Sequence, residues 1–565
     1  MSPSTFDIAS KPTKAYNDQK PGTSGLRKRV KTFQQEHYTH NFIQATLEAM
    51  PSPGARGSTL VVGGDGRYYG KEAIQIIIDL AAGNGVSKLI IGQDGILSTP
   101  AVSNLIRQHK ANGGILLTAS HNPGGPDKDF GIKFNVSNGG PAPEGITDKI
   151  FSIASSLTSI SIATLPKVDL SQVGTQEFQG PSGSKLTIQV VSPVEEYVQL
   201  MKRVFDFDQI RRFFQRRTDF HLLFDALHGV TGPYGKHIFV QELGLPESSV
   251  QHCVPKPDFG GGHPDPNLTY ARELVERVEA EGFQFGAASD GDGDRNMIIG
   301  KGIFVNPSDS VAVLAAHAKR IPYFRERGVS GVARSMPTSQ ALDRVAKRLG
   351  IPHYEVPTGW KFFGNLMDSG KLSICGEESF GTGSDHIREK DGLWAILAWL
   401  NILASLDEEQ PGVTLGSILQ EHYATYGRNY FTRYDYEEVD GVKAGEMMEQ
   451  LRGWCASGEL LGKEIGPGFT LAQADDFAYT DPVDGSKAKK QGIRLLFKDG
   501  SRVIIRLSGT GSQGATVRLY VERYEEDASK SNAPASEALK DLICLAQDFA
   551  GIEKYTGRKE PTVIT

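Results

Sequence analysis

The sequence predicts an α/β protein whose C-terminal part changes to an α+β domain with an antiparallel sheet. Up to Pro411, short β-rich runs alternate with segments of helical periodicity. Three of the β-rich runs end in loops rich in glycine and polar residues. Beyond Pro411, closely spaced runs alternate apolar and polar residues and are joined by short turns. Strands separated by helices are typical of parallel, crossover-connected sheets, whereas strands joined by tight turns are typical of antiparallel ones.

The first unit is a succession of strand-like and helical runs. In order, these runs cover 59–62, 73–82, 88–91, 101–110 and 115–118. Because a helix-length segment separates each strand-like run from the next, successive strands can lie parallel in one sheet.

Two further units follow the same plan. One begins at 220–224 and returns as a strand at 283–288; the other begins at 331–334, continues through the periodic segment 340–349 and reaches 372–375. The order suggests a threefold repeat of architecture without sequence identity. Any α/β chain alternates in this way, so periodicity alone also permits units that are unrelated.

The last region has the pattern of an antiparallel sheet. Its alternating runs cover 493–497, 502–506 and 516–520, and the turns between them contain Lys498-Asp-Gly500 and Gly509-Thr-Gly511. Tight glycine turns between alternating runs predict hairpins. A helix over about 535–550 is expected after the sheet.

Size and charge limit the classes of function. At 565 residues the chain is long for one core, and a prior of roughly 150 residues per domain predicts about four domains. The net charge of −6 provides no basic field, so neither nucleic acid nor an anionic membrane is expected as a partner. An anionic substrate would need local arginines.

Targeting and redox signals predict a cytoplasmic protein. The N-terminus lacks the apolar core of a signal peptide. The longest apolar stretch, 393–406, is interrupted by Asn401 and is shorter than the roughly 20 residues that span a bilayer, so we expect a buried helix. The cysteines lack the paired spacings of a zinc site or a disulfide framework, which favours a reducing compartment: Cys253, Cys375, Cys455 and Cys544.

Ser120 lies where the apolar run 115–118 ends in a turn formed by Asn122-Pro-Gly-Gly125. This turn chemistry predicts that the serine is presented on an exposed loop rather than packed. Ligands of open α/β sheets bind at the carboxyl ends of strands, so the hydroxyl is a candidate nucleophile. The hydrolase signature Gly-x-Ser-x-Gly is absent, and a turn residue without chemistry is the alternative.

Three aspartates alternate with glycines in a second loop, at Asp290, Asp292 and Asp294. This spacing lets the backbone wrap three hard oxygens around one cation, and Mg²⁺ accepts such a small ligand set together with a phosphate oxygen. An EF-hand is excluded because Arg295 and Lys301 occupy the positions that need glycine and glutamate. A structural calcium loop is the alternative. Arg295 could neutralise charge on a phosphoryl group.

The segment 509–514 matches Gly-x-Gly-x-x-Gly, but a strand follows it instead of the helix that a dinucleotide site requires. A glycine-rich turn can still donate backbone N–H groups to a phosphate. A plain hairpin is the alternative. The polar side chains around this turn are Arg506, Ser508, Thr510 and Arg518.

Five motifs, in order along nearly the whole chain, resemble those of the α-D-phosphohexomutases, and of the eukaryotic-type phosphoglucomutases in particular. The motifs are Pro21-Gly-Thr-Ser-Gly-Leu-Arg27, Thr118-Ala-Ser-His-Asn-Pro123, Asp290-Gly-Asp-Gly-Asp294-Arg295, Gly376-Glu-Glu-Ser-Phe-Gly381 and Arg506-Leu-Ser-Gly-Thr510.

The resemblance implies three related α/β domains with mixed sheets and a distinct C-terminal α+β domain, arranged around a central cleft. We expect a phosphoserine-loop domain, a metal-binding-loop domain, a sugar-recognition domain and a phosphate-binding domain. Their predicted ranges are 1–192, 193–305, 306–422 and 423–565.

The implied activity is that of an isomerase that interconverts α-D-glucose 1-phosphate and glucose 6-phosphate. A phosphoserine at Ser120 and glucose 1,6-bisphosphate would carry the phosphoryl group. Mg²⁺ would be held by Ser120 and the three aspartates. The other implied catalytic residues are Arg27, His121, Lys133 and Lys390. The implied substrate-binding residues are Thr23, Ser24, Arg295, Thr358, Gly359, Trp360, Glu377, Ser379, Arg506, Ser508, Thr510 and Arg518.

Two other functions stay open. One is a mutase that also accepts mannose or pentose phosphates, although the sequence of residues 376–381 resembles that of the glucose-specific enzymes. The other is a catalytically silent structural relative, against which the complete set of Ser120, aspartates and Arg295 argues. Glu377 could also be a surface acid and Trp360 a core residue. A monomer or weak homo-oligomer is expected.

Overall fold

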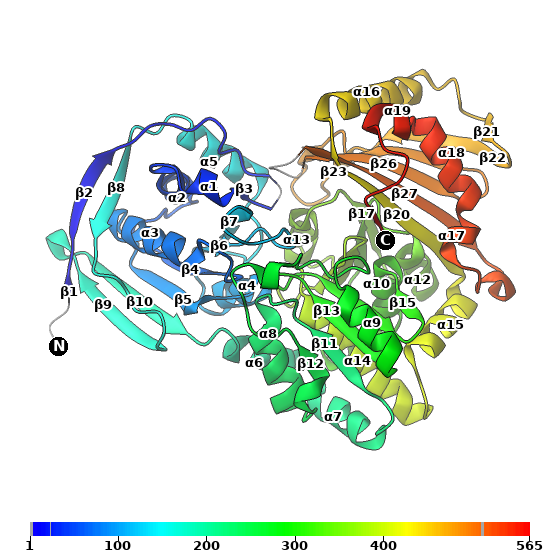
Figure 1. The fold of residues 1–565 in the computed structure, drawn as a ribbon, viewed down its shortest axis with the longest axis horizontal. Coiled ribbons are helices and arrows are strands. Elements are labelled where there is room, and N and C mark those ends of the chain that lie inside the picture. Colours follow the sequence, from blue (N-terminus) through cyan, green and yellow to red (C-terminus); the bar gives the residue numbers. More distant parts are fainter. Residues whose placement is uncertain (1–3, 23, 510–513) are drawn as a thin grey trace.

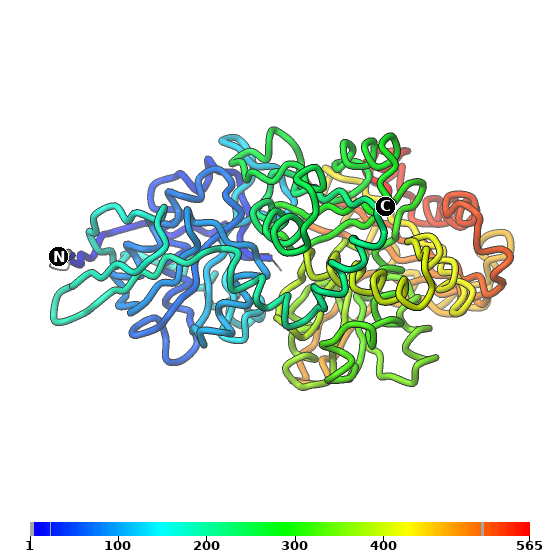
Figure 2. Tube along the Cα trace, turned by 90° about the horizontal axis from the view of Figure 1, so that it is seen from below, coloured from blue at the N-terminus to red at the C-terminus, as the bar shows by residue number. Residues whose placement is uncertain are grey.

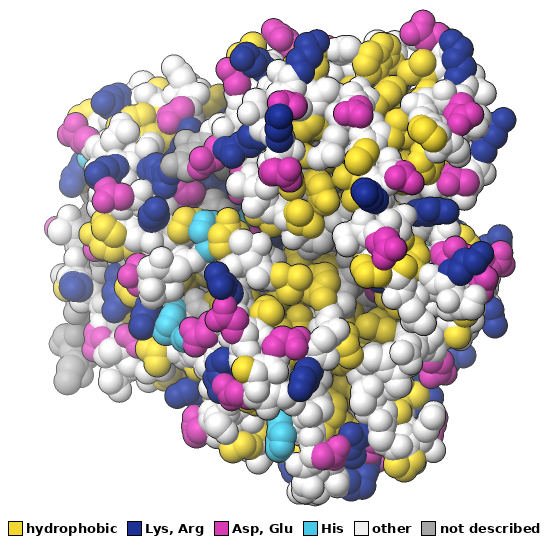
Figure 3. Space-filling model, turned by 45° about the vertical axis from the view of Figure 1, so that its right-hand side comes forward, with side chains coloured by type: hydrophobic (Ala, Val, Ile, Leu, Met, Phe, Trp, Pro, Cys, Tyr) yellow, Lys and Arg dark blue, Asp and Glu magenta, His cyan; other side chains and the backbone are white. Residues whose placement is uncertain are grey.

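A computed structural model describes residues 4–22, 24–509 and 514–565. Figures 1 and 2 show an elongated molecule with the first unit at one end and the C-terminal sheet at the other. The second unit lies at the lower centre of Figure 1, and the third unit lies below the C-terminal sheet. The face seen in Figure 3 mixes basic and acidic side chains, with hydrophobic side chains exposed in patches between them.

The first unit contains an eight-stranded mixed sheet with the order β1-β9-β10-β5-β4-β6-β7-β3. Strands β5, β4 and β6 are parallel, and β7 and β3 continue the sheet antiparallel. The strands are β1 Ser4–Thr5, β3 Leu26–Arg29, β4 Thr59–Gly64, β5 Lys88–Ile96, β6 Gly113–Leu117, β7 Asp129–Val136, β9 Gly174–Gln179 and β10 Lys185–Val191; β2 Asp7–Pro12 pairs with β8 Ser159–Thr164. The helices are α1 Val30–Phe33, α2 Tyr38–Ala49, α3 Gly70–Gly83, α4 Thr99–Gln108 and α5 Glu144–Ala154.

The central strands of this sheet are buried on both faces. Side chains of β4 alternate between two cores, with Val61 in one and Leu60 and Val62 in the other. On β6, Leu116 lies in the same core as Val61, and its neighbour Ile115 lies in the same core as Leu60 and Val62. Parallel strands covered on both sides carry continuous apolar runs, which is why the sequence shows such runs here.

The second unit has a five-stranded sheet with the order β12-β11-β13-β14-β15. The first three of these strands are parallel, and β14 and β15 are antiparallel. The strands are β11 Leu222–Asp225, β12 Val250–Gln251, β13 Phe285–Ser289, β14 Asn296–Gly300 and β15 Ile303–Val305. The helices are α6 Glu195–Val204, α7 Phe207–Arg216, α8 Thr231–Gly235 and α9 Arg272–Glu281.

The third unit has a four-stranded sheet with the order β17-β16-β18-β19, again with a final antiparallel strand. The strands are β16 Val332–Ser335, β17 His353–Val356, β18 Ile374–Glu377 and β19 Gly381–Ser384. The helices are α10 Pro307–Ala316, α11 Pro322–Arg327, α12 Ala341–Leu349, α13 Trp360–Asp368, α14 Gly392–Glu409 and α15 Leu415–Tyr426.

The predicted threefold repeat is confirmed. If four strands of each unit are numbered along the chain, beginning with β4, β11 and β16, all three sheets contain the order 2-1-3-4. The first three strands are parallel and the fourth is antiparallel in every unit. In each unit the loop between strands 3 and 4 carries one of the polar motifs, so these loops occupy equivalent positions.

The C-terminal part forms the predicted antiparallel sheet, with the order β21-β22-β25-β26-β27-β20-β28. Its strands are β20 Arg428–Val439, β21 Glu464–Gly466, β22 Phe469–Asp476, β25 Ile493–Phe497, β26 Arg502–Gly509, β27 Ala515–Glu525 and β28 Val563–Ile564; β23 Tyr479–Thr480 pairs with β24 Lys487–Ala488. The helices are α16 Gly441–Ser457, α17 Ala535–Ala538, α18 Lys540–Ala550 and α19 Ile552–Thr556.

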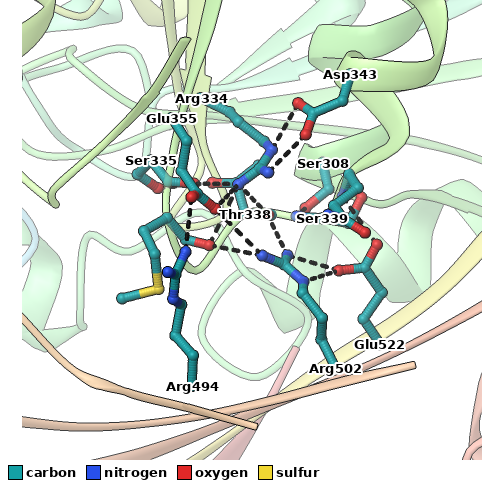
Figure 4. A network of polar contacts seen from close by, with 12 residues as sticks. Ser308, Arg334, Ser335, Thr338, Ser339, Asp343, Glu355, Arg494, Arg502 and Glu522 are labelled. Carbon is teal, nitrogen blue, oxygen red and sulfur yellow. Dashed lines mark hydrogen bonds and ion pairs between the residues drawn. The ribbon is translucent and has the colours of Figure 1, made fainter. Parts of the chain in front are cut away.

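Alternate residues of β26 face two different neighbours. Val503 and Ile505 pack in one core with residues of α16 and α18, whereas Ile504 packs with Met336 of the third unit. The buried Arg502 of β26 donates to the carbonyls of Met336 and Thr338 and so joins the two units (Figure 4). The sheet is therefore docked on the third unit by one face and covered by its own helices on the other.

The longest apolar stretch is the buried helix expected from the sequence, because α14 is enclosed by the second and third units. Trp394 and Trp399 on this helix are both fully buried. Among the described residues, no helix combines the length and the apolar composition that crossing a membrane requires. The four cysteines are free thiols in the described chain.

Candidate functional site

The three motif loops meet at one place. The Ser120 hydroxyl donates a hydrogen bond of 2.8 Å to Asp290 Oδ2 of the second unit. Arg295 pairs with Gly381 of the third unit in an isolated antiparallel bridge. These loops are separated by about 90 to 170 residues in the sequence. They come together because they occupy equivalent positions in the three repeats.

Ser120 is buried, which corrects the expectation of an exposed serine. Its exposed fraction is 3%, because the aspartate loop packs directly over it. A Cβ atom placed on Gly291 would lie 2.6 Å from the Ser120 carbonyl oxygen, so only glycine permits this approach. Ser120 itself has a φ of 53°, in the left-handed region that few side chains adopt.

An ion pair beneath the serine loop holds this conformation. Arg67 donates through Nη2 to the Ser120 carbonyl at 2.9 Å, and its Nε lies 2.9 Å from Asp65 Oδ2. Asp65 also accepts a 2.6 Å hydrogen bond from the Thr118 hydroxyl, which in turn accepts from the Ser120 N–H at 2.8 Å. Sequence reasoning missed this pair; the available signal was that Asp65-Gly66-Arg67 directly follows another apolar strand.

The three aspartates form one cluster, with a carboxylate oxygen of each within 4.8 Å of the others. All three are buried, and Asp292 Oδ1 and Asp294 Oδ1 have no hydrogen-bond partner among the described residues. Burial, and then the charges of Asp292 and Asp294, raise the pKa of Asp290 well above its usual range. Unsatisfied buried carboxylate oxygens facing one another fit a divalent cation, which would remove both the repulsion and the unmet bonding capacity.

Lys390 supplies a positive charge to this cluster. Its Nζ lies 3.2 Å from Asp294 Oδ2. Burial lowers the pKa of Lys390, but the charges of Asp294 and Glu377 outweigh it and raise the pKa above the usual value. Lys390 is therefore an ammonium at neutral pH in this arrangement and can act as a cation or an acid.

Lys133 is paired with Glu389, which sequence reasoning did not select. The two side chains form a buried ion pair between β7 and the loop before α14. Asn135 donates a second hydrogen bond of 2.9 Å to the same Glu389 oxygen. Lys133 therefore binds the same loop of the third unit that carries Lys390.

A cavity of about 680 Å³ opens beside the Ser120 loop. Burial, reinforced by the charges of Arg295 and Arg27, holds the pKa of His121 well below its usual range, so its imidazole is neutral at pH 7. The cavity is rich in cationic side chains, as an anionic ligand requires. The predicted site residues that line it are Ser24, Arg27, His121 and Arg518.

Three residues of the second unit also line this cavity and were not predicted: His263, Asp265 and Tyr270. Asp265 lies 3.7 Å from Arg295 Nη1, and the His263 ring stacks on Tyr270 at a centroid distance of 4.3 Å. They belong to a loop between β12 and α9. The sequence prediction selected loops next to apolar strands, and therefore did not include these residues.

The predicted phosphate loop joins β26 to β27, where Arg506 and Arg518 lie opposite each other. Arg506 Nε donates to the Gln491 carbonyl at 3.1 Å, and Arg518 lies 3.7 Å from Asp435. Ser508 is half-buried on β26. The predicted residues Thr23 and Thr510 lie outside the described part of the chain.

The predicted sugar-loop residues are not among the described residues that line the cavity. Glu377 is buried, accepts a 3.1 Å hydrogen bond from the Gly359 N–H, and has a pKa raised above its usual value by burial. The Thr358 hydroxyl and the Trp360 indole N–H are buried without a hydrogen-bond partner in the described structure. Ser379 is half-buried beside them. The Thr358 hydroxyl can donate a hydrogen bond to a ligand hydroxyl or accept one from it, and the Trp360 N–H can donate one.

Models of known protein families match the chain in four consecutive segments. Residues 18–160, 195–302 and 306–426 match the phosphoglucomutase/phosphomannomutase alpha/beta/alpha domains I, II and III. Residues 428–562 match the C-terminal domain of phosphoglucomutase-1.

Individual proteins match over almost the whole length. A chloroplastic phosphoglucomutase of Arabidopsis thaliana is 56% identical, with 99% of this chain and 90% of that protein covered. A cytoplasmic phosphoglucomutase of Bromus inermis is also 56% identical, over 99% and 100%. The open-form crystal structure of pp63/parafusin, a phosphoglucomutase from Paramecium, has a TM-score of 0.90 at 47% identity, over 99% and 100%. The chain belongs to the phosphoglucomutase/phosphomannomutase family.

Proposed function

We propose that this protein is a phosphoglucomutase that interconverts α-D-glucose 1-phosphate and glucose 6-phosphate. The observation that carries the proposal is the placement of the Ser120 hydroxyl 2.8 Å from Asp290, inside a carboxylate cluster flanked by Lys390. Relatives that are 56% identical over 99% of the chain carry the name phosphoglucomutase. The four domains would span 1–192, 193–305, 306–422 and 423–565.

In the proposed cycle, the P–O bond to Ser120 breaks as a P–O bond to the free sugar hydroxyl forms, giving glucose 1,6-bisphosphate. One proton passes from the sugar hydroxyl to the leaving Ser120 oxygen by way of the proposed base and acid of the site, Lys133 and Lys390. The bisphosphate turns over within the site and returns its other phosphoryl group to Ser120. Mg²⁺, held by Ser120 and the three aspartates, would neutralise charge on the transferring phosphoryl group.

The residues of the chain would supply orientation and charge. Arg295 and Lys390 lie next to the aspartates and can stabilise the equatorial phosphoryl oxygens. The cationic cavity would hold the phosphate that is not being transferred, through Ser24, Arg27 and Arg518. Glu377 with Ser379, and Thr358 to Trp360, would bind the sugar hydroxyls. Lys133 and His121 complete the proposed set, with the protonated Lys390 as the acid that returns the proton to Ser120.

Mass spectrometry of the intact protein tests the central step. Incubation with glucose 1,6-bisphosphate should add one phosphoryl group, at Ser120, and subsequent glucose 6-phosphate should remove it. A mass that does not change under either condition would refute a phosphoserine intermediate. Location in the cytoplasm and a monomer or weak homo-oligomer stay predictions.

Replacement of Asp292 by Asn should raise the Mg²⁺ concentration needed for half-maximal turnover by at least about tenfold and lower kcat, because a neutral oxygen is a poorer ligand for a hard cation. Mg²⁺ titration of the steady-state rate measures both effects. Asp309→Asn, a change at a buried aspartate of α10, is the matched control. An unchanged titration curve for the Asp292 variant would place the metal elsewhere.

Glu377→Gln should lower kcat/KM for glucose 1-phosphate by about 10- to 100-fold, because a charged hydrogen-bond acceptor for sugar hydroxyls is lost. The rate of phosphoryl transfer from glucose 1,6-bisphosphate to Ser120 should fall by less than kcat/KM does. Intact mass measures the transfer, and steady-state kinetics measure kcat/KM. Glu421→Gln, at an exposed glutamate, controls for the loss of charge. Normal sugar affinity in the Glu377 variant would contradict this assignment.

A further inference from the structure

A fully buried histidine and aspartate close the loop between β19 and α14. His386 Nε2 lies 3.0 Å from Asp391 Oδ2, and the side chains of both residues are 0% exposed. The residues between them are Ile387, Arg388, Glu389 and Lys390. Glu389, which binds Lys133, and Lys390, which binds Asp294, therefore both lie on a loop whose ends are joined by this pair.

Asp391 is fixed by four hydrogen bonds. Its Oδ1 accepts from the Tyr197 hydroxyl of α6 at 2.6 Å and from the Trp394 N–H at 3.1 Å, which makes Asp391 the N-cap of α14. Its own N–H donates to the Thr382 carbonyl at 2.9 Å. A carboxylate at a helix N-terminus that receives three donors is compensated without a metal or a charged partner.

A neutral imidazole satisfies each of its partners. Because the Asp391 carboxylate only accepts, His386 Nε2 must carry a hydrogen. Nδ1 is then free to accept from the Ser384 hydroxyl, 2.7 Å away. The ring is also stacked on Trp394 at a centroid distance of 5.5 Å and an interplanar angle of 15°.

The closed loop reaches both other α/β units. The Arg388 N–H donates to Ser103 of α4 at 3.1 Å, and Glu389 pairs with Lys133 of β7. Lys390 Nζ extends to Asp294 of the second unit. A shift of the loop would therefore move the Lys390 ammonium relative to the aspartates, and a displacement of about 1 Å can reduce a rate about 10²-fold.

We propose that His386, Asp391 and Tyr197 are positioning residues that hold Lys390 in its place beside the aspartate cluster. This inference rests on the proposed function, since it assigns the role of Lys390 to the phosphoryl-transfer step. All three residues are buried and lie outside the proposed substrate-binding set. Their effect passes through the loop 386–391.

The test compares two replacements of the histidine. His386→Phe keeps a ring on Trp394 but removes both hydrogen bonds, and should lower kcat about 10²-fold with little change in KM. His386→Gln retains an N–H that can donate to Asp391 and should recover most of the rate. Equal rates for the two variants would overturn the proposal, since packing alone would then explain the effect.

A double-mutant cycle identifies the route of the effect. In a Lys390→Ala background, His386→Phe should cost less than threefold in kcat, because the group that it positions is already absent. The same fold loss in both backgrounds would overturn the proposal. If the unmodified protein has no mutase activity, the proposed function itself fails; if it is active and His386→Phe is equally active, only the positioning role fails.

A matched pair of tyrosine variants keeps the test valid if His386→Phe does not fold. Tyr197→Phe removes only the hydroxyl that donates to Asp391 and should lower kcat measurably. Tyr423→Phe removes an equivalent 2.8 Å hydrogen bond to the buried Asp309, away from the loop, and should leave kcat unchanged. Equal kcat values for the two variants would overturn the proposal.

Discussion

Ser120→Ala is expected to reduce mutase turnover by a factor on the order of 10⁴ or more while leaving the fold intact. Loss of a nucleophile that acts in every cycle removes the whole covalent route. The loop itself should persist, because Arg67 binds the Ser120 carbonyl and Thr118 binds the Ser120 N–H, and both groups belong to the backbone. The substitution removes the hydroxyl's hydrogen bond to Asp290 and its 3.4 Å contact with His121 Nδ1.

A coupled assay of glucose 6-phosphate formation, with glucose 1,6-bisphosphate supplied, measures the loss. Intact mass should show no phosphoryl transfer to the variant. Ser156→Ala is a suitable control, since that hydroxyl bonds only to nearby backbone on the first unit's surface. Turnover near the unmodified rate in the Ser120 variant would rule out the phosphoserine mechanism, whatever the metal dependence.

Arg502→Met is expected to lower the free energy of unfolding of the C-terminal sheet by about 3–5 kcal/mol, because it removes one partner of a buried ion pair. Arg502 and Glu522 are each 3% exposed and lie 2.6 Å apart. Arg502 also donates to the carbonyls of Met336 and Thr338 at 3.1 and 2.7 Å. Figure 4 shows these contacts crossing from β26 to the third unit.

The variant should therefore loosen the docking of the C-terminal sheet as well as the sheet itself. Hydrogen exchange of peptides from β26 and from β16 measures both effects. Arg272→Met breaks an ion pair with Glu276 whose side chains are 79% and 62% exposed, and should change the free energy of unfolding by less than about 1 kcal/mol. Similar exchange in the two variants would show that the buried network contributes no docking energy.

This network forms the polar part of the interface between the third unit and the C-terminal sheet, beside the hydrophobic contact of Met336 with Ile504. Glu355 accepts from Arg334 at 3.0 Å and from Arg494 of β25 at 2.7 Å, so one carboxylate bridges two arginines from different units (Figure 4). Buried charges are tolerated when each has a partner. Docking of the sheet supplies partners that the third unit alone does not contain.

The sequence predicted the architecture and placed the three motif loops next to strands. Apolar periodicity is a local property, and it located strands such as β6, β13 and β18 before their loops. Residues at the carboxyl ends of such strands share one edge of the sheet, so the serine, aspartate and glutamate motifs could be assigned to one site. The repeat of strand order 2-1-3-4 confirms this reasoning for the loops.

Tertiary structure alone decided how these groups are held and charged. The exposure of Ser120 was mispredicted because the loop of another unit covers it, and a turn motif carries no information about that neighbour. The partners of Lys133 and Lys390 lie 256 and 96 positions away along the chain, at Glu389 and Asp294. Local patterns determine which face a side chain occupies, whereas its ion-pair partner and its pKa depend on how whole domains pack and exclude water.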